Sequence, residues 1–292
     1  MYQLINVGGC NLGGDAFLLL GAEKTALMDS GYSFSAPKMT ENIKAVLGDR
    51  PLDYVFLTHS HFDHASGSAM CRQVWPDVKV ISSEYAANVF TKPSAAKTML
   101  EMNESAAKMC GVELDPSVPT DLKTDIIVHE GDVIDLGGIT FVVYEVPGHT
   151  RGSICFYSPE EKLMIGSETF GLPSTGIASV MPCCVVGYNM SMESIRKVMK
   201  LDVEHYLMPH MGEIHGQAVR QFFYDAEYWT EFVKDMIVSG HLAGKTDEEL
   251  VEKYKDMFYV GGQAAIQSEA AFLINARHKI PMIIREQLGG SN

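Results

Sequence analysis

The chain of 292 residues is long enough for one large domain or for a domain with an appendage. It carries 23 lysine and arginine residues against 37 aspartate and glutamate residues, a net charge of -14. This acidity works against broad binding to phosphate backbones or anionic membranes, and no apolar run reaches the roughly 18 residues that would suggest a membrane span.

The N-terminal stretch 1–7 lacks the basic flank and the sustained apolar core of a secretory signal. Six cysteines are spread along the chain and form no compact disulfide framework, and the adjacent Cys183 and Cys184 are poor partners for each other. We therefore expect a cytoplasmic protein with reduced thiols. Its partner is expected to be a small-molecule substrate, with no nucleic acid and no membrane, and the sequence leaves room for a homodimer.

Strands and helices alternate over the first 215 residues, as judged from apolar runs and from apolar residues spaced along one side. In chain order we expect strands at 16–20 and 25–28, a helix at 36–47, a strand at 53–58, a helix at 64–74, a strand at 78–81, a helical stretch at 83–112, strands at 126–128, 139–146, 153–157 and 163–165, a helix at 192–201 and a strand at 205–208. The pattern indicates two β-rich halves with helices between them.

Beyond residue 216 the sequence becomes helical. An amphipathic stretch covers 217–238, a capping-box pattern at Thr246 to Glu249 opens a second helix to about residue 258, and a third begins at residue 268. We therefore predict an α/β body at 1–215, with a helical insertion at about 83–120, and a helical cap region at 216–292 packed on that body.

Seven residues crowded with histidine follow the predicted strand at 53–58: Thr58-His59-Ser60-His61-Phe62-Asp63-His64. Two histidines two residues apart in extended chain point to the same side, and a tight turn can bring Asp63 and His64 to a neighbouring position. Imidazoles suit zinc and iron, and a carboxylate adds a hard oxygen ligand. The spacing predicts a metal site, and the alternative is a solvated histidine-rich turn.

With this motif the sequence resembles the metallo-β-lactamase superfamily, and the resemblance runs in order over about residues 1–215. A family-like string, Pro-Gly-His-Thr-Arg-Gly-Ser, surrounds His149, and Met-Pro-His-Met-Gly surrounds His210. The elements that match the family are Asp29-Ser30-Gly31, then His59, His61, Asp63 and His64, then His149, and finally His210.

One element departs from the family pattern. The family has a Gly-Asp pair about nineteen residues after the second-motif histidine, and its aspartate bridges two metals. Counting nineteen from His149 lands on Glu168, which we align with that aspartate. The rival alignment pairs Gly166-Ser167 with Gly-Asp and leaves no bridging carboxylate, which would give a mononuclear site or a Glu168 that only supports a ligand.

The resemblance implies an αββα sandwich, an α/β (α+β) fold of the metallo-β-lactamase type with a C-terminal helical appendage. It also implies two divalent metal ions, for which zinc is our first choice and iron or manganese would also fit. One ion would take His59, His61 and His149, and the other would take Asp63, His64 and His210, with Glu168 shared.

The same resemblance implies the chemistry. A water between the two cations would become hydroxide at physiological pH and attack a carbonyl or phosphoryl centre. Asp63 would be catalytic, receiving the proton of the nucleophile and delivering it to the leaving group. Asp29 would orient a ligand imidazole, or would simply form a turn. Tyr188 and His215 are candidate substrate contacts.

We therefore expect a metal-dependent hydrolase that acts on a carbonyl ester, a thioester or a lactone. Glyoxalase-II-like thioesterases and lactonases have a similar layout, and this preference rests on fold-level analogy. One alternative is an iron-dependent redox enzyme of the oxygen reductase or sulfur dioxygenase type on the same fold. Another is a non-catalytic binding or regulatory protein, supported by the changed position at Glu168.

Overall fold

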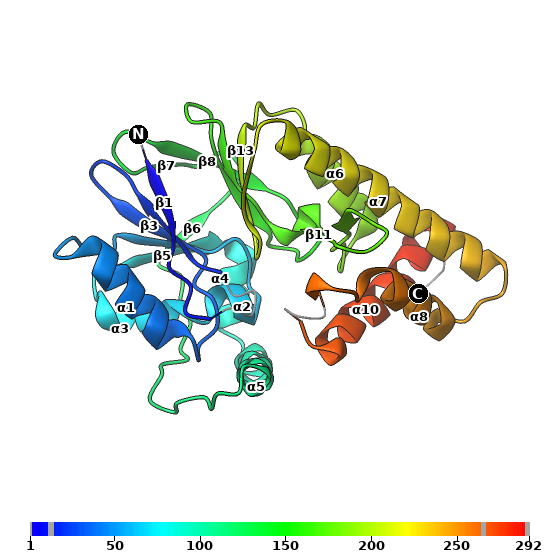
Figure 1. Ribbon diagram of the computed structural model, residues 1–292, viewed down its shortest axis with the longest axis horizontal. Helices are drawn as coiled ribbons and strands as arrows, with labels where there is room; N and C mark the ends of the chain where they lie inside the picture. Colours follow the sequence, from blue (N-terminus) through cyan, green and yellow to red (C-terminus); the bar gives the residue numbers. More distant parts are fainter. Residues whose placement is uncertain (1, 11–14, 264–266, 290–292) are drawn as a thin grey trace. The chain divides into compact units, whose positions relative to one another are not determined.

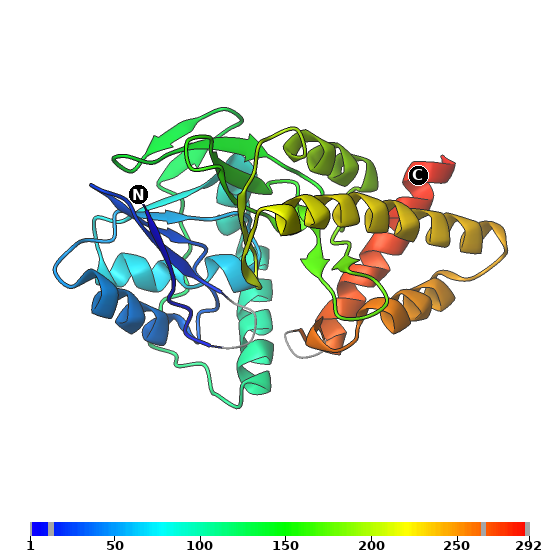
Figure 2. The same ribbon diagram turned by 45° about the horizontal axis from the view of Figure 1, so that its top comes forward.

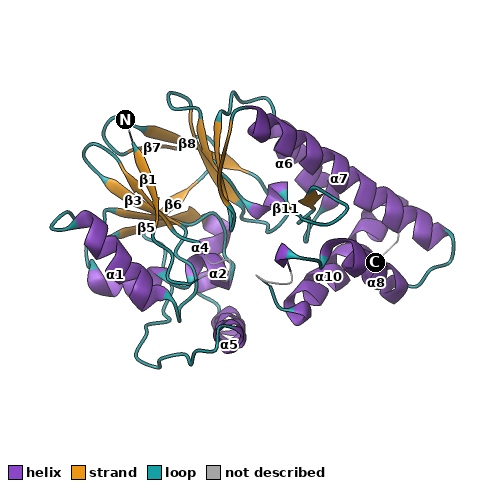
Figure 3. Ribbon diagram, in the orientation of Figure 1, coloured by secondary structure: helices purple, strands orange, loops and turns teal. Residues whose placement is uncertain are grey.

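The computed structural model describes residues 2–10, 15–263 and 267–289 (Figure 1). Backbone packing divides the chain into two compact units, of which the first holds Met1–Glu145 and Ile154–Ile165 and the second holds Val146–Ser153 and Gly166–Asn292. The fold has two sheets flanked by helices and further helices toward the C-terminus (Figure 3), so the predicted αββα class is confirmed. The boundary predicted at residue 215 stays a prediction.

The first unit contains a six-stranded sheet whose strands follow one another in sequence order. The first and second strands and the second and third strands pair antiparallel, whereas each later pair, from the third strand to the sixth, is parallel. Because parallel strands end at the same edge of a sheet, the chain leaves β3 and β4 side by side, with Met28 opposite Phe56. The strands are β1 (Gln3–Asn6), β2 (Phe17–Leu20), β3 (Thr25–Met28), β4 (Tyr54–Phe56), β5 (Lys79–Ser83) and β6 (Ile126–Val128).

Two helices cover one face of this sheet: α1 (Ala36–Leu47) and α3 (Ser68–Val74) (Figure 1). A proline in its first turn favours the start of α1, because the missing N–H of proline would have no partner there. Met39, Ile43 and Leu47 recur at helical spacing and are buried in the core beneath the sheet. The predicted bounds of α1 agree with the structure.

The first unit also contains four antiparallel strands of the second sheet: β7 (Val133–Asp135), β8 (Thr140–Glu145), β9 (Ile154–Ser158) and β10 (Leu163–Ile165). Phe56 of β4 lies against Phe156 of β9, with ring centroids 4.6 Å apart, and meets Phe141 of β8 edge-on at 6.1 Å. All three rings are fully buried. These aromatic contacts form the interior between the two sheets.

Two helical predictions in the first unit are divided in the structure. The stretch expected at 64–74 consists of α2 (Phe62–Ala65) and α3, which are separated at Gly67. The stretch expected at 83–112 consists of α4 (Glu84–Phe90) and α5 (Pro93–Met109). Pro93 explains the second division, because proline begins a helix readily but cannot donate to the preceding turn.

The second unit is mainly helical (Figure 3). Its four longer helices pack on one another (Figure 2) and are α6 (Tyr188–Val198), α7 (Gln217–Leu242), α8 (Asp247–Phe258) and α10 (Glu269–Leu288). The capping box predicted at Thr246 is confirmed, because its side chain and that of Glu249 each bind the backbone of the other. The remaining elements are the short helix η1 (Glu168–Phe170) and the strand pairs β11 (Leu172–Pro173) with β12 (Val180–Met181) and β13 (His205–Met208) with β14 (Gly212–His215).

Helix α7 begins with an aromatic segment that packs inside the second unit. Phe222 and Phe223 contact Tyr206 of β13, with ring centroids 5.3 and 5.1 Å away, and Phe223 meets Phe170 edge-on at 5.6 Å. These four rings fix η1 and β13 against α7. Although α7 has 26 residues, it carries charged side chains, and no helix in the described ranges is long and apolar enough to cross a membrane.

The close approach of Gly67 to Ser30 gives a test of the first unit. A Cβ atom added at Gly67 would lie 2.0 Å from the carbonyl oxygen of Ser30, so either the turn after β3 or the start of α3 would have to shift. We expect Gly67→Ala to lower the free energy of unfolding by about 1–3 kcal/mol, as overpacking does. Chemical denaturation measures this change.

Gly262→Ala is the matched control. A Cβ atom at Gly262 would meet nothing within 4 Å, and its backbone does not have a positive φ. We expect this variant to have the stability of the unmodified chain. Equal stability of the Gly67 and Gly262 variants would contradict the proposed packing constraint.

Candidate metal centre

The carboxylate of Asp29 joins the ends of β3 and β4 in the first unit. Asp29 directly follows β3, and its backbone N–H donates to the carbonyl of Phe56 at 2.8 Å, which extends the parallel pairing by one residue. The backbone N–H of Thr58 donates to Oδ1 of Asp29 at 2.8 Å, and the Thr58 hydroxyl donates to Oδ2, also at 2.8 Å. The backbone of Asp29 is left-handed, with φ 52°, which aspartate tolerates better than most residues.

Asp29 also determines which nitrogen of two histidines faces the site. Nδ1 of His64 lies 2.8 Å from Oδ2 of Asp29, and Nδ1 of His59 lies 3.0 Å from the Thr58 hydroxyl. Since that hydroxyl donates to Asp29, its oxygen accepts a hydrogen bond from Nδ1–H of His59. Both rings therefore carry their proton on Nδ1 and present the lone pair of Nε2, which is the arrangement found in histidines that bind a metal.

The histidine motif of residues 58–64 brings its rings together at the start of α2. The ring centroid of His59 lies 4.7 Å from that of His61 and 4.1 Å from that of His64. Oδ2 of Asp63 lies 3.6 Å from Nε2 of His64. The first unit thus places three imidazoles and one carboxylate in a single group, with His59 and His64 buried and Asp63 partly exposed.

In the second unit the segment 146–153 presents His149 through backbone and hydroxyl contacts. Nδ1 of His149 lies 3.0 Å from the carbonyl oxygen of Cys183, so this ring also donates through Nδ1, and Nε2 is the nitrogen that faces the other donors of the second unit. Its backbone N–H donates to the hydroxyl of Thr169 at 3.2 Å, and that hydroxyl donates to the carbonyl of Val146 at 2.7 Å. Thr169 therefore links the His149 loop to η1.

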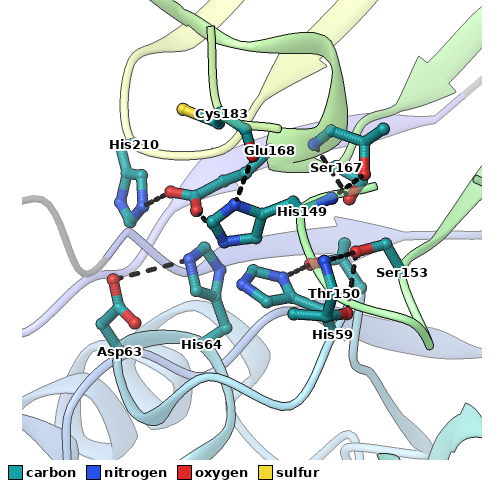
Figure 4. A network of polar contacts seen from close by, with 12 residues as sticks. His59, Asp63, His64, His149, Thr150, Ser153, Ser167, Glu168, Cys183 and His210 are labelled. Carbon is teal, nitrogen blue, oxygen red and sulfur yellow. Dashed lines mark hydrogen bonds and ion pairs between the residues drawn. The ribbon is translucent and has the colours of Figure 1, made fainter. Parts of the chain in front are cut away.

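The carboxylate of Glu168 lies between two imidazoles of the second unit (Figure 4). Oε2 is 2.5 Å from Nε2 of His149, and Oε1 is 2.5 Å from Nε2 of His210. Ser167 instead caps η1 by accepting from the backbone of Thr169. Between the two alignments considered from the sequence, the structure places the carboxylate of Glu168 beside the histidines and gives Ser167 a local role.

The environment of Glu168 favours its charged form. Burial alone would raise the pKa of this carboxyl, but the charges of His149 and His210 and their hydrogen bonds outweigh burial and hold its pKa well below its ordinary value. A carboxylate that stays ionised in a buried position, with a nitrogen at each oxygen, is a donor of the type that bridging carboxylates supply to pairs of metal ions.

His210 lies in the short turn of the β13–β14 hairpin. The turn contains Pro209, His210 and Met211, and Met208 pairs with Gly212 across it. The backbone of His210 is left-handed, with φ 72°, as hairpin turns of this length require at one position. Only 6% of its side chain is exposed, so the turn directs the ring into the protein.

Each compact unit therefore supplies a set of His, Asp or Glu donors of the types that bind metal ions. The fit is supported by the Nδ1 partners of three histidines, since each of these partners makes Nε2 the nitrogen that can face a cation. The first set is His59, His61, Asp63 and His64, and the second set is His149, Glu168 and His210.

The two candidate substrate contacts lie elsewhere in the second unit. Tyr188 begins α6 and is buried. Its backbone N–H donates to the sulfur of Met282, and Nζ of Lys234 lies 5.9 Å from the centroid of its ring. His215 ends β14, where its Nδ1 lies 2.9 Å from that of His205. Their roles as substrate contacts stay predictions.

Three supporting groups were not identified from the sequence: Thr58, Thr169 and the carbonyl of Cys183. Thr58 stands directly before His59, so its place in the motif could have indicated its role. A backbone carbonyl carries no side-chain signal, and Thr169 acts only because η1 folds back on the loop that contains His149.

Replacing Asp29 tests whether its hydrogen bonds prepare the site for metal. Asp29→Asn retains the size of the side chain but replaces one carboxylate oxygen with an amide NH₂ group. This group donates, whereas both oxygens of Asp29 accept hydrogen bonds from Thr58 and His64. We expect the affinity for Zn²⁺ to fall roughly 10–100-fold, as it does when the partner of a metal-binding histidine is changed. Competition with a chromogenic chelator measures this affinity.

Asp132→Asn is the control, because Asp132 also lies near a histidine, His129 at 3.8 Å, but both are exposed and belong to neither donor set. We expect its zinc affinity to be unchanged. If Asp29→Asn binds zinc as tightly as Asp132→Asn, the orienting role of Asp29 is wrong.

Three relatives share the sequence or the fold. The chain is 29% identical to an acyl-coenzyme A thioesterase MBLAC2 of Gallus gallus over 192 residues, which is 58% of this chain and 64% of the relative. It is 28% identical to a hydroxyacylglutathione hydrolase of Rhizobium meliloti over 118 residues, 40% of this chain and 34% of the relative. Both matches thus span less than two thirds of the relative.

A crystal structure of a metallo-beta-lactamase family protein from Thermus thermophilus superposes with a TM-score of 0.69 at 18% identity, covering 99% of this chain and 94% of that one, and this likeness shows the fold alone. The family model of the metallo-beta-lactamase superfamily matches residues 11–241, which is more than half of the sequence. The chain belongs to the metallo-β-lactamase superfamily.

Proposed function

We propose that this protein is a metal-dependent hydrolase that cleaves a carbonyl ester, a thioester or a lactone. The observation that carries the proposal is the shared orientation of His59, His64 and His149, each held at Nδ1 so that Nε2 can bind a cation. Two relatives named as a thioesterase and a hydroxyacylglutathione hydrolase support hydrolysis at an acyl group. Of the three substrate classes, thioesters therefore have the most support.

The ligand assignment is part of the same proposal. One ion would be held by His59, His61 and His149, and a second by Asp63, His64 and His210, with Glu168 serving both. The two carboxylate oxygens of Glu168, each facing a different imidazole, support its shared role. Zinc is the first metal to test, since imidazole and carboxylate donors suit it, and iron and manganese are the alternatives.

The two ions, when bound, would supply a water of lowered pKa and a Lewis acid for the substrate oxygen. The residues of the chain would orient the imidazole rings and exchange protons. Asp63 is suited to receiving the proton of the nucleophile and giving it to the leaving group, because 18% of its side chain is exposed and it lies 3.6 Å from His64. Asp29 would keep the rings of His59 and His64 from turning during this exchange.

A substrate panel tests the proposed reaction. We expect protein loaded with zinc to hydrolyse acyl-thioesters, and to hydrolyse bis-aryl phosphates at least about 100-fold less efficiently as judged by kcat/KM, because the two relatives are named for acyl substrates. Lactones and simple esters complete the panel.

The outcomes separate the competing functions. Turnover of the phosphates alone would overturn the acyl preference. Protein that contains iron and consumes oxygen in the presence of a thiol would favour the redox alternative. Metal-loaded protein that turns over no member of the panel and consumes no oxygen would favour a non-catalytic role.

The metal content of a Glu168→Gln variant tests the shared carboxylate. The neutral amide is a weaker ligand, so we expect elemental analysis of desalted protein to find about two ions per unmodified chain and about one in the variant. Glu160→Gln is the control, because Glu160 is exposed and accepts a hydrogen bond from Thr140 outside both donor sets. One ion per chain in the unmodified protein would favour a mononuclear site.

A further inference from the structure

A second cluster of metal-binding side chains lies at the open end of the β13–β14 hairpin. It consists of His205, Glu213 and His215, whose donor atoms all lie within 4.8 Å of one another. It belongs to neither donor set described above. We propose that this cluster is a separate, peripheral site for a zinc ion.

The pairing of the two strands places these side chains on one face. His205 of β13 stands directly opposite His215 of β14, and Leu207 stands opposite Glu213. Because side chains two residues apart on a strand point to the same side, Glu213 shares its face with His215, and both share it with His205. The register of the hairpin is therefore enough to bring the three side chains together on one face of the strand pair.

The distances between the donor atoms suit a shared cation. Nδ1 of His205 and Nδ1 of His215 are 2.9 Å apart, and the same oxygen of Glu213 lies 3.5 Å from one and 3.6 Å from the other. Ligands of a tetrahedral zinc ion with bonds of about 2.0–2.1 Å are about 3.3 Å apart, and the three observed separations lie on either side of that value. The carboxylate is too far from either ring for a charge-assisted hydrogen bond, which spans about 2.7–2.9 Å.

The donor types and the exposure of the cluster also fit this metal. Two imidazoles and one carboxylate form a His₂Glu set, which leaves a fourth position for water. The side chains of His205, Glu213 and His215 are 41%, 25% and 58% exposed, so an ion can reach them from solution. The negative charge of the whole chain further favours uptake of a cation.

The bound ion would fasten β13 to β14 at the end of the hairpin opposite the turn. The backbone N–H of Gly216 already donates to the carbonyl of Glu204 at 2.7 Å just beyond the His205–His215 pair. The turn at the other end carries His210, so the ion would steady the strands that present this side chain. This role is structural, and it does not depend on the reaction proposed above.

Zinc titration of the holoenzyme tests the site. The metal that stays bound after treatment with a chelator is first measured by elemental analysis. The protein is then titrated with Zn²⁺ in a calorimeter, and we expect one further equivalent to bind. His205→Gln and Glu213→Gln should each weaken this step at least about tenfold, because each removes one of three ligands. A rise in Tm with added zinc, present in the unmodified protein and lost in the two variants, is the second readout.

His129→Gln is the matched control, because His129 is also exposed and pairs with a carboxylate, that of Asp132, but has no third donor among the described residues. It should bind the further equivalent as the unmodified protein does. The proposal is overturned if the unmodified holoenzyme takes up no further zinc, or if both cluster variants take it up with unchanged affinity. Neither readout requires a substrate, so failure here is distinct from failure of the hydrolase proposal.

Discussion

The organisation of the first donor set depends on one buried carboxylate. Asp29 accepts hydrogen bonds from the backbone and hydroxyl of Thr58 and from Nδ1 of His64. It can do so because β3 and β4 run parallel and end at the same edge, so that residues 29 and 58 emerge next to each other. A register fixed by the hydrophobic core therefore sets which nitrogen carries the proton in the rings of His59 and His64.

The second donor set is positioned by turns that follow strands. His149 is held by a backbone carbonyl and a threonine hydroxyl, Glu168 lies in a single helical turn, and His210 occupies a left-handed position in a hairpin. Donor side chains keep their orientation when neighbouring residues pack around them. Phe170, which follows Glu168 by two residues, supplies this support by packing edge-on against Phe223 of α7. The helical part of the second unit thus contributes to the order of the donors.

Much of the fold could be predicted from the sequence where hydrophobic periodicity is strong. The helix at 36–47 and the strands at 25–28, 126–128, 163–165 and 205–208 have the predicted bounds. The break at Gly67 was missed because it comes from contact with Ser30, which is distant in sequence. β1, β7, β11, β12 and β14 were not predicted, and for β11 and β12 the reason is that two residues of extended chain give almost no periodic signal.

For the candidate site, the donor residues could be predicted from the sequence, whereas their geometry could not. Its donors are visible in the sequence because histidine and acidic residues at these spacings are uncommon outside metal sites. The geometry around Glu168 could not be predicted, because two alignments were both compatible with the spacing after His149. The pairing of His215 with His205 could not be predicted either, because it depends on the register of the β13–β14 hairpin.

The path of the chain through the two compact units has a practical consequence. The backbone passes from one unit to the other three times, after Glu145, Ser153 and Ile165, and the middle excursion of residues 146–153 carries His149. No single cut separates the two units, because even a cut after Ile165 leaves residues 146–153, which carry His149, attached to the first unit. Segmental isotope labelling or split-protein designs would need junctions in exposed loops within one unit, such as the Gly244 bend between α7 and α8.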